Sequence, residues 1–436
     1  MDDFSLILRE MDESAQKHGI AGRILAGLSG GADSVALLRG LCALRQEHRF
    51  TVFAVYVNHG LRKAAAEEER FCADLCDRLG VPLLIKRVHV PPGGSLEAAA
   101  RAVRYRAFRE AMEETQATTL ALAHHRNDQA ETVLLHLMYG AGGEGLSGMK
   151  EYLAPVWRPL LRLSRDTLRR ALAELSQDWR EDESNQDTAL TRNAIRAELI
   201  PAMEKLYPQA VPALCRAAEI LGSESDYLNV QAGDWLRANA AHGAWHFLLL
   251  QPLSLLHVAL QRRVLRSYAA SLGLTLEYQH TEALLALLQM PPGSRVNLPD
   301  DWHALRTRER LHFLPPRLDI PSPQSAALRA EPFDGNAGDG LLRQAIPESL
   351  WRDAVLRTRQ AGDRITPFGM RGSMKLKDYF IAKGVDQPFR DGWPLLCRGQ
   401  DVLWVIGVGA SEHLRYQPSA DQYFVIHYSG LLPNQL

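Results

Sequence analysis

The chain of 436 residues is 46% apolar and 23% charged, the balance of a globular protein of about three domains. Its 50 Lys and Arg residues are matched by 51 Asp and Glu residues, which excludes a whole-chain field that attracts nucleic acid, membranes or acidic substrates. Any anionic partner must therefore be held by local basic patches. The five cysteines contain no C-x-x-C pair, which argues against a disulfide scaffold and a zinc knuckle.

The sequence carries no sign of export or of membrane insertion. The N-terminus is acidic and lacks the basic start and apolar run of a secretory signal. The longest stretch without charged side chains, residues 238–261, is interrupted by Asn, Gln, His and Pro and is too polar to cross a bilayer. We therefore expect a cytoplasmic protein that has no membrane partner and no obligate protein partner.

The first 140 residues alternate strand and helix patterns. Apolar runs predict strands at residues 23–28, 51–58, 82–90 and 118–123, and amphipathic runs predict helices such as 34–47 and 65–79. This alternation indicates an α/β fold around a parallel sheet, in which ligands lie beyond the carboxyl ends of the strands.

The later chain has a different organisation. Five glycines within residues 140–148 predict a loop or lid, and helical patterns dominate residues 205–290. Runs at 295–298 and 305–313 predict a hairpin, and a Pro- and Gly-rich stretch then indicates a linker. We expect a catalytic α/β domain with a basic helical lobe at 1–204, a helical domain at 205–315, a linker at 316–345 and a small α+β domain at 346–436.

The strand at residues 23–28 leads into a glycine-containing loop and then into a helix. The loop consists of Ser29, Gly30, Gly31, Ala32, Asp33 and Ser34. Glycines there let backbone N–H groups and the helix N-terminus face one anion, and the hydroxyls add donors. Asp33, among phosphate-binding groups, suits a Mg²⁺ ligand. The lysine of a Walker-type loop is missing. The alternative is an ordinary turn in which Asp33 and Ser34 cap the helix.

Further motifs point to one family. They are VNHGLR at 57–62, ARAVRYRAF at 100–108, AHHRNDQAET at 123–132, DESNQDTALTRNAIR at 182–196 and RITPFGMRGSMKLKDYFIAKGV at 364–385. With the SGGADS loop, in this order and spacing, the chain resembles the tRNA(Ile)-lysidine synthetase family of the ATP pyrophosphatase (PP-loop) superfamily. The resemblance extends over nearly the whole chain.

The resemblance implies a Rossmann-like, adenine-nucleotide-binding PP-loop domain and a ligase that uses ATP, Mg²⁺ and L-lysine. Such an enzyme adenylates the 2-oxygen of the wobble cytidine in isoleucine tRNA with a CAU anticodon, and lysine then displaces AMP. The product, lysidine, switches codon reading from AUG to AUA. Because a free lysine amine is neutral only about once in roughly 2,500 molecules at pH 7, the site must help it to lose its proton.

The AHHRNDQAET motif supplies candidate carboxylates. Asp128 and Glu131 are three residues apart, so on a helix both face one cleft and suit a cationic substrate. By position, the resemblance implies that His124 joins them in lysine binding and adenylation. The alternative, compatible with the first, is that Asp128 is a helix N-cap and Glu131 completes a capping box. Many relatives have Asp where this chain has Asn127, which leaves the role of that position open.

Arginines and a histidine complete the predicted site. Arg104, preferred to Arg101 on the same predicted helix, suits a triphosphate or a lysine carboxylate. His59, at the end of a predicted strand, suits the nucleotide edge. The resemblance places Arg192 or Arg196 near the reacting atoms. A solvated surface position is the alternative for each of these residues.

Two basic segments are candidates for contacts with tRNA phosphates. The first contains Arg158, Arg162, Arg165, Arg169 and Arg170. The second, residues 364–399, has seven basic against three acidic residues and includes Lys375, Lys377 and Lys383. The resemblance assigns this second segment to the acceptor arm of the tRNA, and a solvated helix face is the alternative for the first.

Three other functions are disfavoured. A tRNA thiolase of the same superfamily would rely on paired cysteines, and this sequence has no C-x-x-C. A small-molecule amidating synthetase would not need basic domains downstream. A binding protein without catalytic activity would have no need of an intact phosphate loop.

Overall fold

The computed structural model describes residues 2–58, 65–89, 96–180, 191–241, 246–316, 327–417, 422–430 and 432. The chain forms two compact units, unit 1 at residues 1–226 and unit 2 at residues 227–436. Within the described ranges, no helix has the length and apolar character that a membrane span requires.

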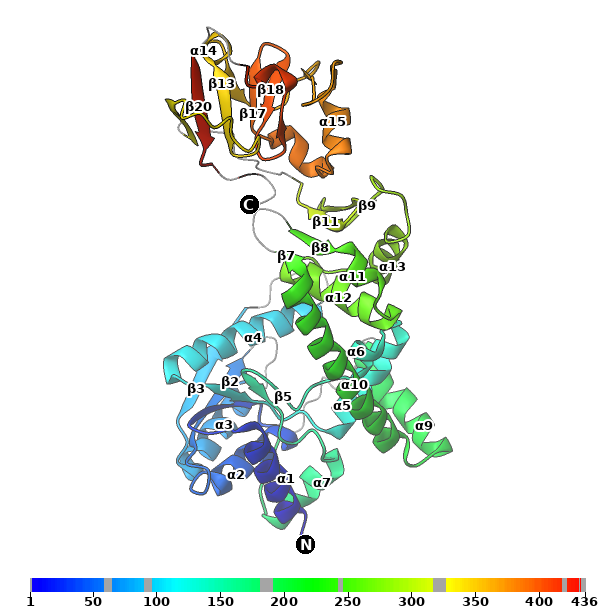
Figure 1. Ribbon diagram of the computed structural model, residues 1–436. Helices are drawn as coiled ribbons and strands as arrows, with labels where there is room; N and C mark the ends of the chain where they lie inside the picture. Colours follow the sequence, from blue (N-terminus) through cyan, green and yellow to red (C-terminus); the bar gives the residue numbers. More distant parts are fainter. Residues whose placement is uncertain are drawn as a thin grey trace. The chain divides into compact units, whose positions relative to one another are not determined.

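Unit 1 is built on a six-stranded sheet in the order β3-β2-β1-β4-β6-β5 (Figure 1). Its strands are β1 (Arg23–Leu28), β2 (Thr51–Asn58), β3 (Leu83–Arg87), β4 (Thr119–Ala121), β5 (Tyr152–Leu153) and β6 (Val156–Trp157). All neighbours pair in parallel except β5, which is antiparallel to β6. The four predicted strands and the α/β fold class are confirmed.

Helices cover both faces of this sheet. The helices of this part of the chain are α1 (Asp3–His18), α2 (Ala32–Leu44), α3 (Ala65–Leu79), α4 (Leu96–Thr115), α5 (Arg126–Met138), α6 (Gly143–Leu146) and α7 (Arg165–Glu174). Ile24 of β1 packs with α1, α2, α3 and α7 on one face, whereas its neighbour Leu25 packs with Phe108 of α4 on the other. Because both faces are covered, successive residues of the strand are apolar.

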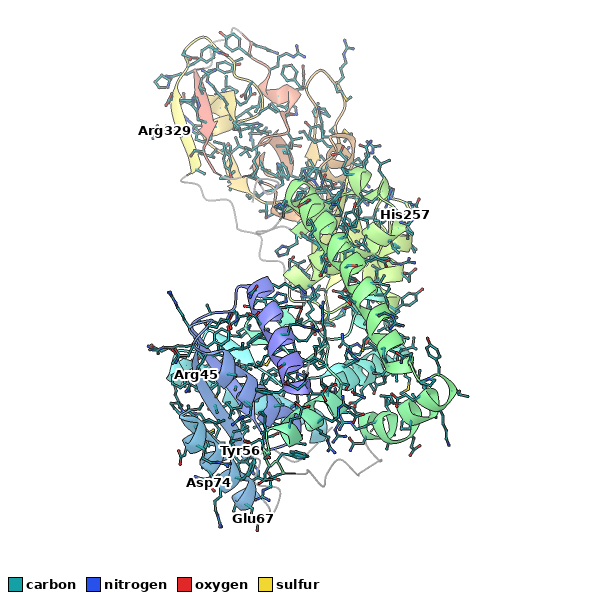
Figure 2. All side chains as sticks on the ribbon, turned by 90° about the horizontal axis from the view of Figure 1, so that it is seen from below. Arg45, Tyr56, Glu67, Asp74, His257 and Arg329 are labelled. Carbon is teal, nitrogen blue, oxygen red and sulfur yellow. The ribbon has the colours of Figure 1, made fainter. Side chains whose placement is uncertain are left out.

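Polar contacts attach α3 to its neighbours. The Tyr56 hydroxyl on β2 donates a hydrogen bond to Glu68 at 3.0 Å, and Arg45 after α2 donates one to the Leu79 carbonyl at 3.2 Å (Figure 2). Cys72, four residues after Glu68 and so on the same side of α3, packs beside Gly30, 3.4 Å from the position that a Cβ of this glycine would occupy. The helix therefore supports the loop that leaves β1.

Unit 1 ends in helical structure. It comprises α8 (Thr191–Ala194), the π-helical turn η2 (Ile195–Leu199), α9 (Ile200–Leu206) and α10 (Ala210–Asn239), which continues across the boundary between the units. The helical character predicted for the segment after residue 157 is confirmed in part, because the first helix there, α7, begins only at Arg165.

The first part of unit 2 combines helices with a small antiparallel sheet in the order β7-β8-β11-β10-β9. The strands are β7 (Ala240–Ala241), β8 (His246–Leu249), β9 (Arg295–Asn297), β10 (His303–Arg306) and β11 (Arg310–Leu314), and the helices are α11 (Leu250–Ser254), α12 (Val258–Ser271) and α13 (Tyr278–Leu287). The predicted hairpin is confirmed in part: β9 matches its first strand, but residues 305–313 form the end of β10, a turn and most of β11 rather than one strand. The sequence does not predict β8, because a short apolar run fits a strand or a buried helix equally well.

The remainder of unit 2 is an α+β structure, as predicted. One sheet has the order β12-β20-β13, and another has the order β14-β17-β18-β15-β16, with β19 paired to β18. The strands are β12 (Leu328–Pro332), β13 (Arg343–Pro347), β14 (Val355–Arg357), β15 (Arg364–Ile365), β16 (Met374–Lys375), β17 (Leu395–Arg398), β18 (Asp401–Val405), β19 (Gly409–Ala410) and β20 (Tyr423–Tyr428). The helical segments are α14 (Glu348–Trp351), α15 (Leu376–Ala382), η4 (Gln387–Gly392) and η5 (Glu412–Leu414).

The linker predicted at residues 316–345 is wrong where strands occupy it. β12 pairs with β20, and β13 begins at Arg343. β12 is an edge strand, a position that tolerates the proline at its end, so proline content alone does not distinguish it from a linker.

Candidate active site

The phosphate loop connects the end of β1 to the start of α2. Gly30 has φ +82°, a left-handed conformation that favours glycine. The N-cap of α2 is Gly31, which supplies no side-chain cap. Ser34 Oγ accepts a hydrogen bond from the Ser29 N–H at 3.1 Å and donates one to the Gly31 carbonyl at 2.9 Å. The alternative in which Asp33 and Ser34 cap this helix is therefore wrong, and the helix N-terminus remains suited to an anion.

Asp33 has one bonded and one orphaned oxygen. Its Oδ2 lies 3.5 Å from His125 Nε2, whereas its buried Oδ1 has no hydrogen-bond partner among the described residues. Burial alone would raise the pKa of Asp33, but the hydrogen bond and charge of His125 and the charges of Arg165 and Arg169 lower it. An ionised carboxylate with an unused buried oxygen fits a Mg²⁺ ligand.

A magnesium ion at Asp33 would need further ligands from outside the protein side chains. Within the part of the chain that the structure describes, no group of three His, Cys, Asp or Glu side chains is placed to hold a metal. Mg²⁺ in nucleotide sites commonly binds one or two carboxylates together with phosphate oxygens and water. The donor set at Asp33 is compatible with that arrangement.

His125 links the phosphate loop to α5. It is the N-cap of α5: its Nδ1 accepts a hydrogen bond from the Asp128 N–H at 3.3 Å, and the Asp128 carboxylate accepts one from the His125 N–H at 2.9 Å. Burial would lower the pKa of His125, but the hydrogen bond to Asp33 and the charges of Asp128, Asp33 and Glu131 raise it. One imidazole thus lies between a carboxylate of the phosphate loop and a carboxylate of α5.

The capping box differs from the predicted one. The sequence predicts Asp128 as N-cap and Glu131 as the third residue of the box, but the helix begins three residues earlier, so Asp128 itself takes the third position. Glu131 consequently has no part in capping α5. Asp128 and Glu131 lie on one side of α5, because Arg196 bonds to both.

Two arginines form ion pairs with the carboxylates of α5. The Glu131 side chain is only 1% exposed, and its oxygens lie 2.6 Å from Arg196 Nε and 3.1 Å from Arg192 Nε. Arg196 Nη2 also lies 3.3 Å from Asp128 Oδ1. Burial would lower the pKa of Arg196, but Glu131 and Asp128 raise it. Arg192 and Arg196, four residues apart, lie on one side of their helical segment, because both contact Glu131.

His124 lies among positive charges. Burial and the charges of Arg158, Arg192, Arg101 and Arg104 lower its pKa to about 3. Its buried Nδ1 has no hydrogen-bond partner among the described residues. At neutral pH the imidazole is therefore uncharged, and the guanidinium groups around it suit a phosphate or a carboxylate. The structure does not favour Arg104 over Arg101 as the site arginine, because the charges of both lower the pKa of His124.

The first predicted basic segment does not form one surface. Arg158 is only 7% exposed and belongs to the group around His124. The charges of Arg165 and Arg169, on α7, lower the pKa of Asp33 in the phosphate loop. Arg162 and Arg170 pair with carboxylates of α10 and α1 at 3.0 and 2.6 Å. The alternative of one solvated helix face is also wrong, because residues 158–164 are not helical and the five arginines have different partners.

The other predicted residues have separate locations. His59 lies outside the described residues. Lys375, Lys377 and Lys383 are exposed on β16 and at α15 of unit 2.

The glycine-rich segment at residues 140–148 is hydrogen-bonded to α5. Gln129 of α5 donates to the carbonyls of Ser147 and Met149 and accepts a hydrogen bond from the Met149 N–H at 2.7 Å. These bonds favour a fixed connection over a lid.

Comparison with known families and proteins shows similarity along most of the chain. A PP-loop domain model matches residues 7–203, a TilS substrate binding domain model matches 248–312, and a TilS substrate C-terminal domain model matches 354–427. The tRNA(Ile)-lysidine synthase of Caldanaerobacter subterraneus is 31% identical and that of Geobacter sulfurreducens 32%, with 93% and 97% of this chain and 94% and 97% of the relatives covered. The tRNA(Ile)-lysidine synthase of Chromobacterium violaceum is 34% identical, with 91% of this chain and 92% of the relative covered.

Proposed function

The chain belongs to the tRNA(Ile)-lysidine synthase family, and from this premise we propose that it ligates L-lysine to position 2 of the wobble cytidine in isoleucine tRNA with a CAU anticodon. One observation carries the proposal: His125 contacts Asp33 of the phosphate loop and Asp128 of α5. Groups suited to ATP and groups suited to a cationic amine therefore share one histidine. The expected product is lysidine, which switches codon reading from AUG to AUA.

The first half of the proposed reaction is adenylation. The cytidine 2-oxygen attacks the α-phosphorus of ATP, an O–P bond forms, and pyrophosphate leaves. Backbone N–H groups at the start of α2 would bind the phosphates, and Asp33 would hold a Mg²⁺ ion, which would neutralise phosphate charge. Arg104 and the other arginines around neutral His124 supply positive charge for the anionic groups.

The second half is transfer to lysine. The neutral ε-amine forms a bond to C2, and the C2–O bond breaks to release AMP. Asp128 is the carboxylate that the amine can reach, because its side chain is 13% exposed and that of Glu131 is 1% exposed. Glu131 holds Arg196 and Arg192 beside Asp128, and the incoming amine shares Asp128 with Arg196.

Contacts with the tRNA backbone complete the proposal. Lys375, Lys377 and Lys383 in unit 2 are exposed and can neutralise phosphates. In unit 1, Arg162 offers a further exposed cation that would exchange its carboxylate partner for phosphate. These contacts hold the tRNA, and the groups around α5 carry out the chemistry.

Incorporation of labelled lysine tests the proposal directly. The substrates are an unmodified isoleucine tRNA transcript with a CAU anticodon, ATP and Mg²⁺, with a methionine tRNA transcript and a reaction without ATP as controls. We expect label only in the isoleucine transcript, with one AMP released per lysine. Binding of that transcript without incorporation, while a control enzyme is active, would contradict the ligase assignment.

A further inference from the structure

Unit 2 has an exposed aromatic ring, Phe368, that has no role in the proposed chemistry. Phe368 lies in the turn after β15, and 57% of its surface is exposed. The guanidinium of Arg415 lies over the ring, 4.6 Å from its centroid. An exposed phenylalanine with a cation on one face is suited to stacking with a planar group on its other face.

Ionic and backbone contacts, rather than burial, fix the position of this ring. The Glu412 carboxylate accepts a hydrogen bond from the Gly369 N–H at 2.6 Å and pairs with Arg415 at 2.5 and 3.0 Å. The Glu412 N–H donates to the Thr366 carbonyl at 2.8 Å. Since Gly369 has φ +84°, the turn requires a left-handed residue next to Phe368. One carboxylate therefore positions both the turn and the arginine.

Exposed cations follow the ring in the sequence. Arg371, Lys375 and Lys377 are exposed within nine residues of Phe368, and Met370 beside it is exposed as well. Surfaces that bind single-stranded nucleic acid combine cations for the backbone with aromatic faces on which bases stack. A surface that only neutralised phosphates would have no need of a positioned aromatic ring.

We propose that Phe368 is a stacking platform for an unpaired base of the tRNA. This role rests on the proposed function, because it takes tRNA as the ligand. The base stacks on the ring face opposite Arg415, and Lys375 and Lys377 neutralise the neighbouring phosphates. Since bases within a duplex are stacked on each other, the base comes from the single-stranded 3′ end or from a loop.

Equilibrium binding of the full chain to the isoleucine transcript, at several salt concentrations, tests this role. Phe368→Ala should weaken binding about tenfold without changing the slope of log K against log salt, because stacking releases no counterions. Phe368→Trp should retain the affinity. Tyr278→Ala, which truncates an aromatic side chain of α13 that is 77% exposed, is the matched control and should have no effect.

A transcript without the unpaired 3′ nucleotides distinguishes the two sources of the base. If a base of the 3′ end stacks on Phe368, wild-type protein binds this transcript about tenfold more weakly than the full transcript. Phe368→Ala then causes no additional loss of affinity for it. If a loop base stacks, Phe368→Ala weakens binding of both transcripts equally. Wild-type affinity of Phe368→Ala for both transcripts, or an equal loss in Tyr278→Ala, would overturn the proposal. A wild-type chain that binds no isoleucine transcript would instead contradict the proposed function.

Discussion

Charged side chains are arranged differently around α5 in unit 1 and along residues 371–377 in unit 2. Around α5 they are buried and paired, as in the contacts of Glu131 with Arg192 and Arg196. In residues 371–377 the basic side chains are exposed. Buried pairs depend on geometry and are little screened by salt, whereas exposed charges are screened and tolerate substitution. The first arrangement suits chemistry at fixed atoms, and the second suits binding to a polyanion.

The largest effect should follow from the orphaned oxygen of the phosphate loop. Asp33→Asn removes the charge that suits Mg²⁺, so formation of AMP in the presence of ATP and tRNA should fall by at least about 10²-fold. The exposed carboxylate of Asp74 on α3 provides a matched control, and Asp74→Asn should react at the wild-type rate. Normal turnover of Asp33→Asn would contradict the metal-ligand assignment.

The carboxylates of α5 should affect lysine more than ATP. Asp128→Asn retains an oxygen to accept the His125 N–H but loses the charge, so the KM for lysine should rise about tenfold while the KM for ATP changes little. Glu131→Gln should lower kcat rather than raise the KM for lysine, because Glu131 positions Arg192 and Arg196. An unchanged KM and kcat for lysine in Asp128→Asn would leave Asp128 with the capping role alone.

The exposed lysines should affect affinity in a salt-dependent manner. Charge reversal at Lys375 and Lys377 should weaken tRNA binding about tenfold at low salt and reduce the slope of log K against log salt by about two, with no change in the rate of the bound complex. Arg329→Glu on β12 of the same unit is the control (Figure 2). Equal losses in the control and the double variant would mean that general charge, and not this surface, holds the tRNA.

The smallest effect on activity should come from a paired carboxylate outside the site. Burial would raise the pKa of Glu151, but Lys17 and His18, at 2.9 and 3.1 Å, lower it from its ordinary value of 4.5 to about 2. A lowered pKa stabilises the fold above about pH 4.5, and this stabilisation is lost as the pH falls through about 2. Glu151→Gln should therefore reduce the free energy of unfolding by about 2 kcal/mol at pH 7 and by little near pH 2, without changing lysine incorporation.

Denaturant titrations at the two pH values check this prediction. Equal destabilisation at pH 7 and pH 2 would show that the ion pairs are not its origin.

The fold of unit 1 could be predicted because its signals are local. Alternating apolar and amphipathic runs determine β1 to β4, and the observed β1 and β2 have the predicted bounds. Capping of α5 could not be predicted correctly, because the position of its first residue depends on His125 meeting Asp33 across the sheet edge. β8 could not be predicted because its pairing partner β11 is distant in the chain.

The site could be predicted as a set of motifs but not as a set of contacts. The sequence identifies Asp33, Asp128 and Glu131, but it selects His124 and misses His125, whose contacts with Asp33 and Asp128 depend on where α5 begins. It also assigns Arg165 and Arg169 to an RNA surface, whereas the structure places their charges near Asp33. A signal was present in their i, i+4 spacing, which puts both on one face of α7.

The proposed mechanism assigns the carboxylates on either side of His125 to different half-reactions. Its most direct test is the amount of adenylated tRNA formed from α-labelled ATP before and after addition of lysine. Asp128→Asn should accumulate adenylated isoleucine transcript at close to the wild-type rate and release it slowly when lysine is added, whereas Asp33→Asn should accumulate none. Failure of Asp128→Asn to adenylate the transcript, or wild-type release by lysine, would contradict this assignment.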